Sequence, residues 1–158
     1  YTPTVHIFEA LPGYIEHIQE KFATNRKVKV HPYGLFERDT SETLTVVGPG
    51  SSLYNSRSNG DQKPNSVNVQ LRDIKGVMDE IGAERIDLLK INIEGAEFPL
   101  LKRLIDAGYL HRFDHIMVQY HEFAPYANWQ RFVINKRLAE SHHRVWNYPF
   151  VWEKWSIN

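Results

Sequence analysis

The stretch DLLKINIEGAEFPLL, residues 87–101, combines an apolar run, a polar turn and the start of an amphipathic helix. The apolar run covers residues 86–93 and is typical of a buried strand. Helical spacing then begins, with apolar side chains at Leu100, Leu101, Leu104 and Ile105. The polar residues at the junction are Asn92, Glu94 and Glu97, with Gly95 among them. So much polarity where a buried strand becomes a helix indicates a functional turn or a specialised helix start.

The composition is that of an ordinary folded domain. The chain has 158 residues, of which 42% are hydrophobic and 24% charged, so it is long enough to form a core and is not disordered. Nineteen basic residues balance nineteen acidic ones, which gives no electrostatic case for a nucleic-acid partner or an anionic membrane. There is no cysteine, and no apolar stretch approaches the ~20 residues of a membrane span. We therefore expect a cytoplasmic protein that binds neither nucleic acid nor membrane.

Strand and helix patterns alternate along the chain. We predict strands at residues 5–9, 28–35, 44–47, 67–71, 86–93, 115–120, 143–146 and 151–155, with the last two paired antiparallel. We predict helices at residues 14–22, 74–81, 95–107 and 128–141, with Gly82 and Gly108 ending two of them. Residues 48–66, rich in Gly, Ser, Asn and Pro, are predicted to form a loop, either a mobile lid or a surface excursion. The alternation implies one α/β domain over residues 1–158 with a mostly parallel sheet.

Polar residues stand at the carboxyl ends of four predicted strands. They are Glu9, then Tyr33 with Gly34, then Asn92 with Glu94, and finally His121 with Glu122. Ligands bind beyond the carboxyl ends of strands in open parallel sheets, so these side chains suit a nucleotide-type cofactor. A carboxylate such as Glu9 can accept hydrogen bonds from both hydroxyls of a ribose, and a glycine lets an adenine ring approach the backbone.

Each of these residues also has a purely structural interpretation. Glu94 stands before a helix and favours its positive N-terminus by ~0.3–1 kcal/mol. Glu97 is interpreted as a first-turn helix acid rather than a catalyst, and Gly95 as a residue that permits tight strand-to-helix packing. Glu9 is harder to explain in this way, because a carboxylate directly after Val-His-Ile-Phe requires solvent or a partner.

Three segments in this order resemble the FkbM-type methyltransferases. They are VHIFEALPGYIEHIQEKF at residues 5–22, VKVHPYGL at 28–35 and IDLLKINIEGAEFPLLKRL at 86–104. The similarity runs from about Val5 to His121 and is most specific around residues 90–97. It implies a Rossmann-like class I methyltransferase sheet, S-adenosylmethionine (SAM) as cofactor, and O-methylation of a sugar or other small-molecule hydroxyl.

The resemblance also implies roles for individual residues. Glu9 would hold the SAM ribose, Ala10 and Leu11 would line the adenine side, and Tyr33 and Gly34 would lie opposite them. In addition, Asn92 and Glu94 would face the methionine end of SAM and the acceptor. His121 would lie on the acceptor side, where a neutral imidazole could act as general base.

Two departures from the family's pattern affect this interpretation. Asn92 replaces the usual aspartate and cannot act as a general base near neutral pH. The family's first strand and its glycine-rich turn have no counterpart before Val5, so the edges of the strands at 5–9 and 86–93 would be ~9.6 Å apart, twice the ~4.8 Å strand spacing. We therefore expect the chain to be the C-terminal part of a longer protein, or else the two strands to close up and damage the SAM pocket. A catalytically inactive methyltransferase-like fragment or binding module remains the alternative function.

Two further groups of residues allow other interpretations. The eight histidines suggest a metal-dependent hydrolase, but His121-Glu122 and His142-His143 match no helical two-His ligand pattern, and the second pair is predicted at a helix end where cations are favourable. The C-terminal aromatic residues would form either a sugar-stacking face, a homo-oligomer interface or ordinary packing; they are Trp146, Tyr148, Phe150, Trp152 and Trp155.

Overall fold

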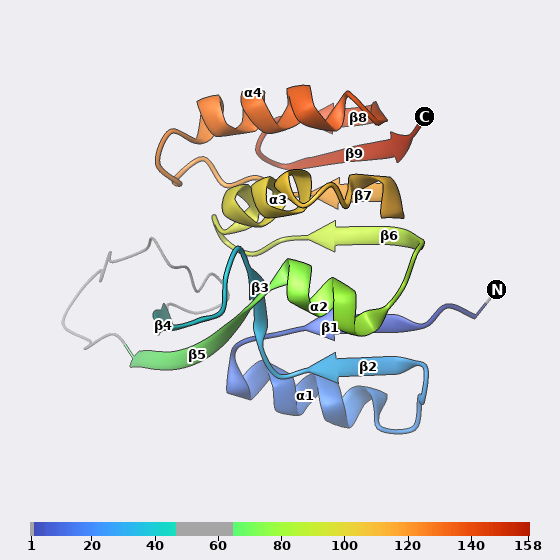
Figure 1. Ribbon diagram of the computed structural model, residues 1–158. Helices are drawn as coiled ribbons and strands as arrows, with labels where there is room; N and C mark the ends of the chain where they lie inside the picture. Colours follow the sequence, from blue (N-terminus) through green and yellow to red (C-terminus); the bar gives the residue numbers. More distant parts are fainter. Residues whose placement is uncertain (1, 47–64) are drawn as a thin grey trace.

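The computed structural model describes residues 2–46 and 65–158 and has an α/β architecture, as the sequence predicts (Figure 1). Its elements in chain order are β1 (Val5–Phe8), α1 (Pro12–Phe22), β2 (Val28–His31), β3 (Gly34–Phe36), β4 (Thr40–Val46), β5 (Asn65–Asp73), α2 (Ile74–Ile81), β6 (Ile86–Ile91), α3 (Glu97–Asp106), η1 (Leu110–Arg112), β7 (Phe113–Val118), α4 (Ala127–Leu138), β8 (His142–Tyr148) and β9 (Trp152–Ile157). None of the helices in these ranges is long and apolar enough to cross a membrane.

The strands form three separate hydrogen-bonded groups within the described ranges. β1 pairs with β2 in parallel, β3 and β4 flank β5, and the largest group has the order β6-β7-β9-β8. β6 and β7 are parallel, whereas β9 is antiparallel to both of its neighbours. The single, mostly parallel sheet expected from the sequence is therefore only partly present, and the antiparallel pairing of the last two strands is confirmed.

β1 and β6 each have one unpaired edge within the described ranges. β1 is bonded only to β2 and β6 only to β7, so the two strands do not close up on each other by hydrogen bonds. Figure 1 shows the two strands running in the same direction. Each of these strands also carries an exposed apolar side chain, with Leu88 of β6 47% exposed and Val5 of β1 40% exposed. A parallel strand in an open α/β sheet is normally covered on both faces, so this exposure is unusual.

The main core lies where α3 packs against β7 and α4. Leu101, Leu104 and Ile116 are fully buried there, and Phe98 stacks on Tyr120 with ring centroids 5.2 Å apart. Helices α2, α3 and α4 form a row in which each contacts the next, whereas α1 packs against β2. α1 has no buried residue, which indicates that the β1–α1–β2 unit is held less tightly than the rest.

The structure corrects several predicted boundaries. The strand expected at 28–35 is split at Pro32-Tyr33 into β2 and β3, which belong to different groups. α4 ends at Leu138 and His142 begins β8, so the helix expected to reach residue 141 is too long, and His142-His143 does not lie at a helix end. Of the loop predicted at 48–66, residues 65 and 66 belong to β5 and the rest lie outside the described residues.

Candidate functional site

The turn from Asn92 to Ala96 links β6 to α3 and has an unusual backbone. Glu94 has φ 53° and Gly95 has φ 99°. A glycine adopts this region without a steric cost, whereas a glutamate does so only when neighbouring contacts hold it. The side chain of Asn92 is exposed at the start of the turn, and Glu94 is part-buried.

Glu97 is the residue that holds this turn. Its side chain is 0% exposed, and its carboxylate reaches back from the first position of α3 to accept two backbone hydrogen bonds. Ile93 N donates to Oε1 and Gly95 N donates to Oε2, both at 2.9 Å. The carboxylate therefore satisfies two amide donors of the turn that precedes the helix.

His121 lies against the same carboxylate. It follows β7, whose ladder continues past Val118 through a hydrogen bond from Gln119 N to Ile91 O. His121 Nδ1 is 2.8 Å from Glu97 Oε1, and its Nε2 is 3.5 Å from Glu94 Oε1. The structure therefore brings Glu94 and His121 together, and Glu97 contacts the other nitrogen of the His121 ring.

Two opposing influences act on the pKa of His121. Burial, the largest single influence, lowers it, but the hydrogen bond to Glu97, the charge of Glu97 and the charge of Glu94 together raise it above the ordinary histidine value. A raised pKa makes the imidazole a better proton acceptor, and the hydrogen bond at Nδ1 leaves Nε2 as the atom that takes up the proton.

The end of β1 carries the other predicted carboxylate. Glu9 is part-buried, and its Oε1 accepts a hydrogen bond from Leu11 N at 2.9 Å. Ala10 and Leu11 pack against a small cluster that includes Leu71 and Ala96. Ile93, the neighbour of Asn92, packs against the same cluster. The chain segments that carry Glu9 and Asn92 therefore meet at one cluster.

Tyr33 lies in the turn after β2, and Gly34 begins β3, where it pairs with Leu71 of β5. A side-chain carbon added at Gly34 would come within 2.6 Å of Leu71 Cδ2 and 3.4 Å of Ala10 Cβ, so packing alone is a reason for glycine here. Tyr33 contacts His31 and lies under the guanidinium of Arg72, 5.0 Å from the ring centroid. It also lines a cavity of about 560 Å³ between the Pro32-Tyr33 turn, the start of β4 and β5.

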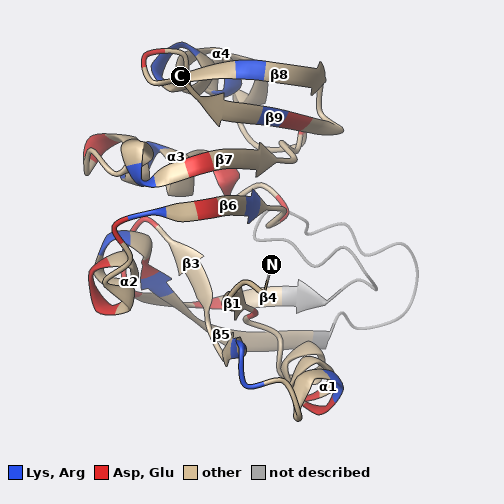
Figure 2. Ribbon diagram, turned by 90° about the vertical axis from the view of Figure 1, so that its right-hand side faces the viewer, with Lys and Arg blue, Asp and Glu red and all other residues tan. Residues whose placement is uncertain are grey.

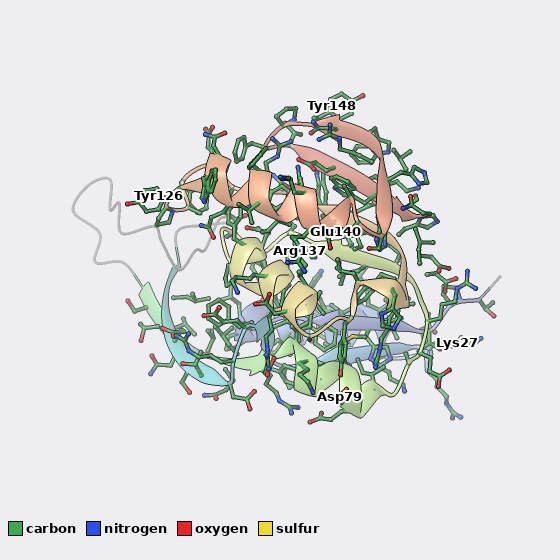
Figure 3. The ribbon with its side chains drawn as sticks, turned by 45° about the horizontal axis from the view of Figure 1, so that its top comes forward. Lys27, Asp79, Tyr126, Arg137, Glu140 and Tyr148 are labelled. Atoms are coloured by element: carbon green, nitrogen blue, oxygen red, sulfur yellow. The ribbon has the colours of Figure 1, made fainter. Side chains whose placement is uncertain are left out.

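The alternative sites predicted from the sequence have simple structural explanations. In residues 2–46 and 65–158, no group of three or more His, Asp or Glu side chains is arranged to hold a metal ion. Of the C-terminal aromatic residues, Trp155 belongs to the core at 3% exposure, whereas Tyr148 is 64% exposed (Figure 3).

Comparison with known proteins places this turn and its partners in a family. A family model described as the methyltransferase FkbM domain matches residues 1–150. The chain belongs to the FkbM methyltransferase family. No curated protein sequence matches it.

One similar solved structure is the FkbM methyltransferase from Methylobacillus flagellatus KT. The identity is 13% and the TM-score 0.58, a likeness that concerns the fold. The alignment covers 98% of this chain but 36% of that protein, so the chain spans about a third of the length of its structural relative.

Within this FkbM domain, Glu97 is the residue whose buried contacts with the turn and with His121 the sequence did not reveal. Its spacing is that of an ordinary first-turn helix acid, and its partner His121 lies in another element. The available signal was the doubled acid around Gly95, at the end of an apolar strand, which a solvated helix start does not require.

Proposed function

We propose that this FkbM domain is part of a SAM-dependent methyltransferase that methylates a hydroxyl group of a sugar or other small molecule. The observation that carries the proposal is His121, held by the buried Glu97 beside Glu94 where β6 and β7 end. An imidazole fixed at one nitrogen by a buried carboxylate is the usual arrangement of a general base.

His121 would take the proton of the acceptor hydroxyl at Nε2. Its Nδ1 proton would stay in the hydrogen bond to Glu97, which fixes the ring orientation. The imidazolium that forms is favoured by the negative charges of Glu97 and Glu94, the same charges that raise the pKa of His121 against the effect of burial. Asn92 is exposed and would orient a ligand through its amide without exchanging a proton.

The residues at the end of β1 have the chemistry needed to hold SAM. Glu9 uses Oε1 to accept the hydrogen bond from Leu11 N, and none of the described residues donates to its Oε2. That oxygen would accept from the ribose hydroxyls, with Ala10, Leu11, Tyr33 and Gly34 beside the adenine. SAM would supply an activated methyl group, and the protein would mainly align the two reactants.

SAM binding and methyl transfer test the two halves of this proposal separately. In calorimetry on the full-length protein, Glu9→Ala should weaken SAM binding by ~1–3 kcal/mol, about 5- to 150-fold. His121→Asn should leave SAM binding within about twofold and abolish the transfer of radiolabelled methyl to an acceptor. A folded protein with no detectable affinity for SAM would instead support an inactive methyltransferase-like module, an outcome that the neutral Asn92 favours.

We also propose that β1 and β6 belong to one Rossmann-like sheet, with a further parallel strand between them. The support is the pair of unpaired edges and the exposure of Leu88 and Val5 on these strands. Amides of β6 that are not bonded to β7 should exchange with solvent quickly in the 158-residue chain and slowly in the full-length protein. Equal exchange rates in the two would contradict this arrangement.

A further inference from the structure

A second cavity lies along α4. It has a volume of about 620 Å³ and lies between α4 and the strands β8 and β9. It is lined by Asn128, Arg131, Phe132, Asn135, Lys136, Ala139, His142, His143, Arg144, Trp155 and Asn158, which we call the α4 groove. None of the residues assigned to methyl transfer lines it, so it requires an explanation of its own.

The lining of the α4 groove places basic side chains among neutral ones. It contains three Lys or Arg side chains and two histidines, and no acidic side chain. Burial lowers the pKa of one of its histidines, His142, so that ring adds no positive charge near neutral pH. Figure 2 shows basic residues on both of its walls, α4 and β8. The chain as a whole has a formal net charge of zero, so this concentration of positive charge is local.

Two of the cations have no carboxylate partner in the described part of the chain. They are Lys136 and Arg144, which instead lie over aromatic rings. Lys136 Nζ is 5.8 Å from the ring centroid of Phe132, and Arg144 Cζ is 5.6 Å from that of Trp155. The third cation, Arg131, is neutralised by an ion pair with the buried Glu153.

Buried hydrogen bonds hold four of the lining residues in place, namely Arg131, Asn135, Trp155 and His142. Glu153 accepts from Arg131, from Asn135 Nδ2 at 3.2 Å and from Trp155 Nε1 at 3.2 Å. His142 is 1% exposed, with Nε2 2.9 Å from Phe113 O. With Arg131 neutralised by Glu153, Lys136 and Arg144 are the cations of the lining that have no carboxylate partner among the described residues.

We propose that the α4 groove binds a small organic phosphate, with the phosphate between Lys136 and Arg144 and its apolar part against Phe132. A guanidinium binds phosphate oxygens in pairs and an ammonium adds a compact charge, so the two cations together suit a doubly charged anion. Phe132 is 53% exposed and offers an apolar surface to the rest of the ligand. The volume lies within the range of small-molecule sites, ~300–1,000 Å³.

This proposal is tested by titrating the full-length protein with phenyl phosphate and with inorganic phosphate at low ionic strength. Binding is measured by NMR or calorimetry. Arg144→Gln and Lys136→Gln should each weaken the binding of phenyl phosphate by about tenfold, which is ~1.4 kcal/mol. Phenyl phosphate should bind several-fold more tightly than inorganic phosphate, and Phe132→Ala should remove that difference. Saturating SAM should not displace phenyl phosphate, which separates this site from the methyl-transfer site.

Arg137→Gln is the matched control on the same helix. Arg137 does not line the groove and pairs with Glu140 at 3.2 Å, and Figure 3 shows the two side by side at the end of α4. This variant should leave the affinity unchanged. The proposal is overturned if phenyl phosphate shows no saturable binding up to about 10 mM. It is equally overturned if Arg137→Gln weakens binding as much as Arg144→Gln, or if neither groove variant changes it.

Discussion

Replacing Glu97 with alanine removes the acceptor of three contacts at once. The carboxylate is 0% exposed and accepts from Ile93 N and Gly95 N, while His121 Nδ1 lies 2.8 Å from it. In the variant, both amides of the turn lose their partner and His121 loses the charge that orients it. The turn after β6 should therefore loosen, and the protein should lose stability.

The expected loss follows from the burial of these groups. A hydrogen bond to a charged group contributes ~1.5–3 kcal/mol, and breaking a buried ionic contact by removing one partner costs ~3–5 kcal/mol. We expect Glu97→Ala to lower the free energy of unfolding by about 3–5 kcal/mol. For a domain of this size, that corresponds to a decrease of roughly 6–20 °C in Tm. Glu97→Gln keeps one acceptor oxygen and should cost less, about 1–3 kcal/mol.

Urea unfolding followed by tryptophan fluorescence measures these changes. Glu94→Gln is the control, because Glu94 also faces His121 but its side chain is 29% exposed and 3.5 Å away. A pair of this kind contributes ~1 kcal/mol or less. If Glu97→Ala unfolds within about 1 kcal/mol of the wild type, or if Glu94→Gln is the more damaging change, the buried carboxylate does not hold the turn.

Three further predictions concern pH and packing. Because the pKa of His121 is raised in the folded protein, the protonated His121 should contribute its full stabilisation below the unfolded pKa of 6.5. This stabilisation should be lost as the pH rises through the pKa of His121 in the folded protein. Unfolding free energies measured between about pH 5 and 9 should show the loss in the wild type and not in Glu97→Gln. Glu153→Ala should lower the free energy of unfolding in urea by about 3–5 kcal/mol, because removing this 1%-exposed carboxylate leaves three buried donors without an acceptor. A loss below about 1 kcal/mol would contradict this. Gly34→Ala should cost about 1–3 kcal/mol through its contact with Leu71, and the cost should shrink in a Leu71→Ala background; additive effects would show that the contact is not made.

The sequence predicted local elements well where periodicity and capping agree. Helix α2 was predicted at residues 74–81 with Gly82 as its stop, and the structure has these bounds, with Gly82 at φ 65°. Asp73 caps the helix by accepting a hydrogen bond from Lys75 N at 2.9 Å. A short amphipathic helix with a glycine end is specified by nearby residues, so the sequence is sufficient to predict it.

The pairing partners of the strands and the buried polar contacts could not be predicted from the local sequence pattern. The extended run at 28–35 has the same pattern whether its two halves bond to one strand or, as here, to β1 and β5 separately. Proline at position 32 lacks a backbone donor, and was the local sign of this break. Glu97 and His121 are 24 positions apart, and their contact depends on β6 and β7 pairing in register.

The proposed site also depends on how firmly the two halves of the chain are joined. Glu9 belongs to the β1–β2 pair and His121 to the group that contains β6 and β7, and no strand pairing connects these groups within the described ranges. Their common contact is the small cluster to which Ala10, Leu11 and Ile93 pack. Methyl transfer requires the donor and the acceptor to be aligned within a few tenths of an ångström, and misplacement by ~1 Å can cost ~100-fold in rate. A strand between β1 and β6 would join the two halves by hydrogen bonds on both of its edges, so the same feature that completes the sheet would also set the distance between cofactor and base.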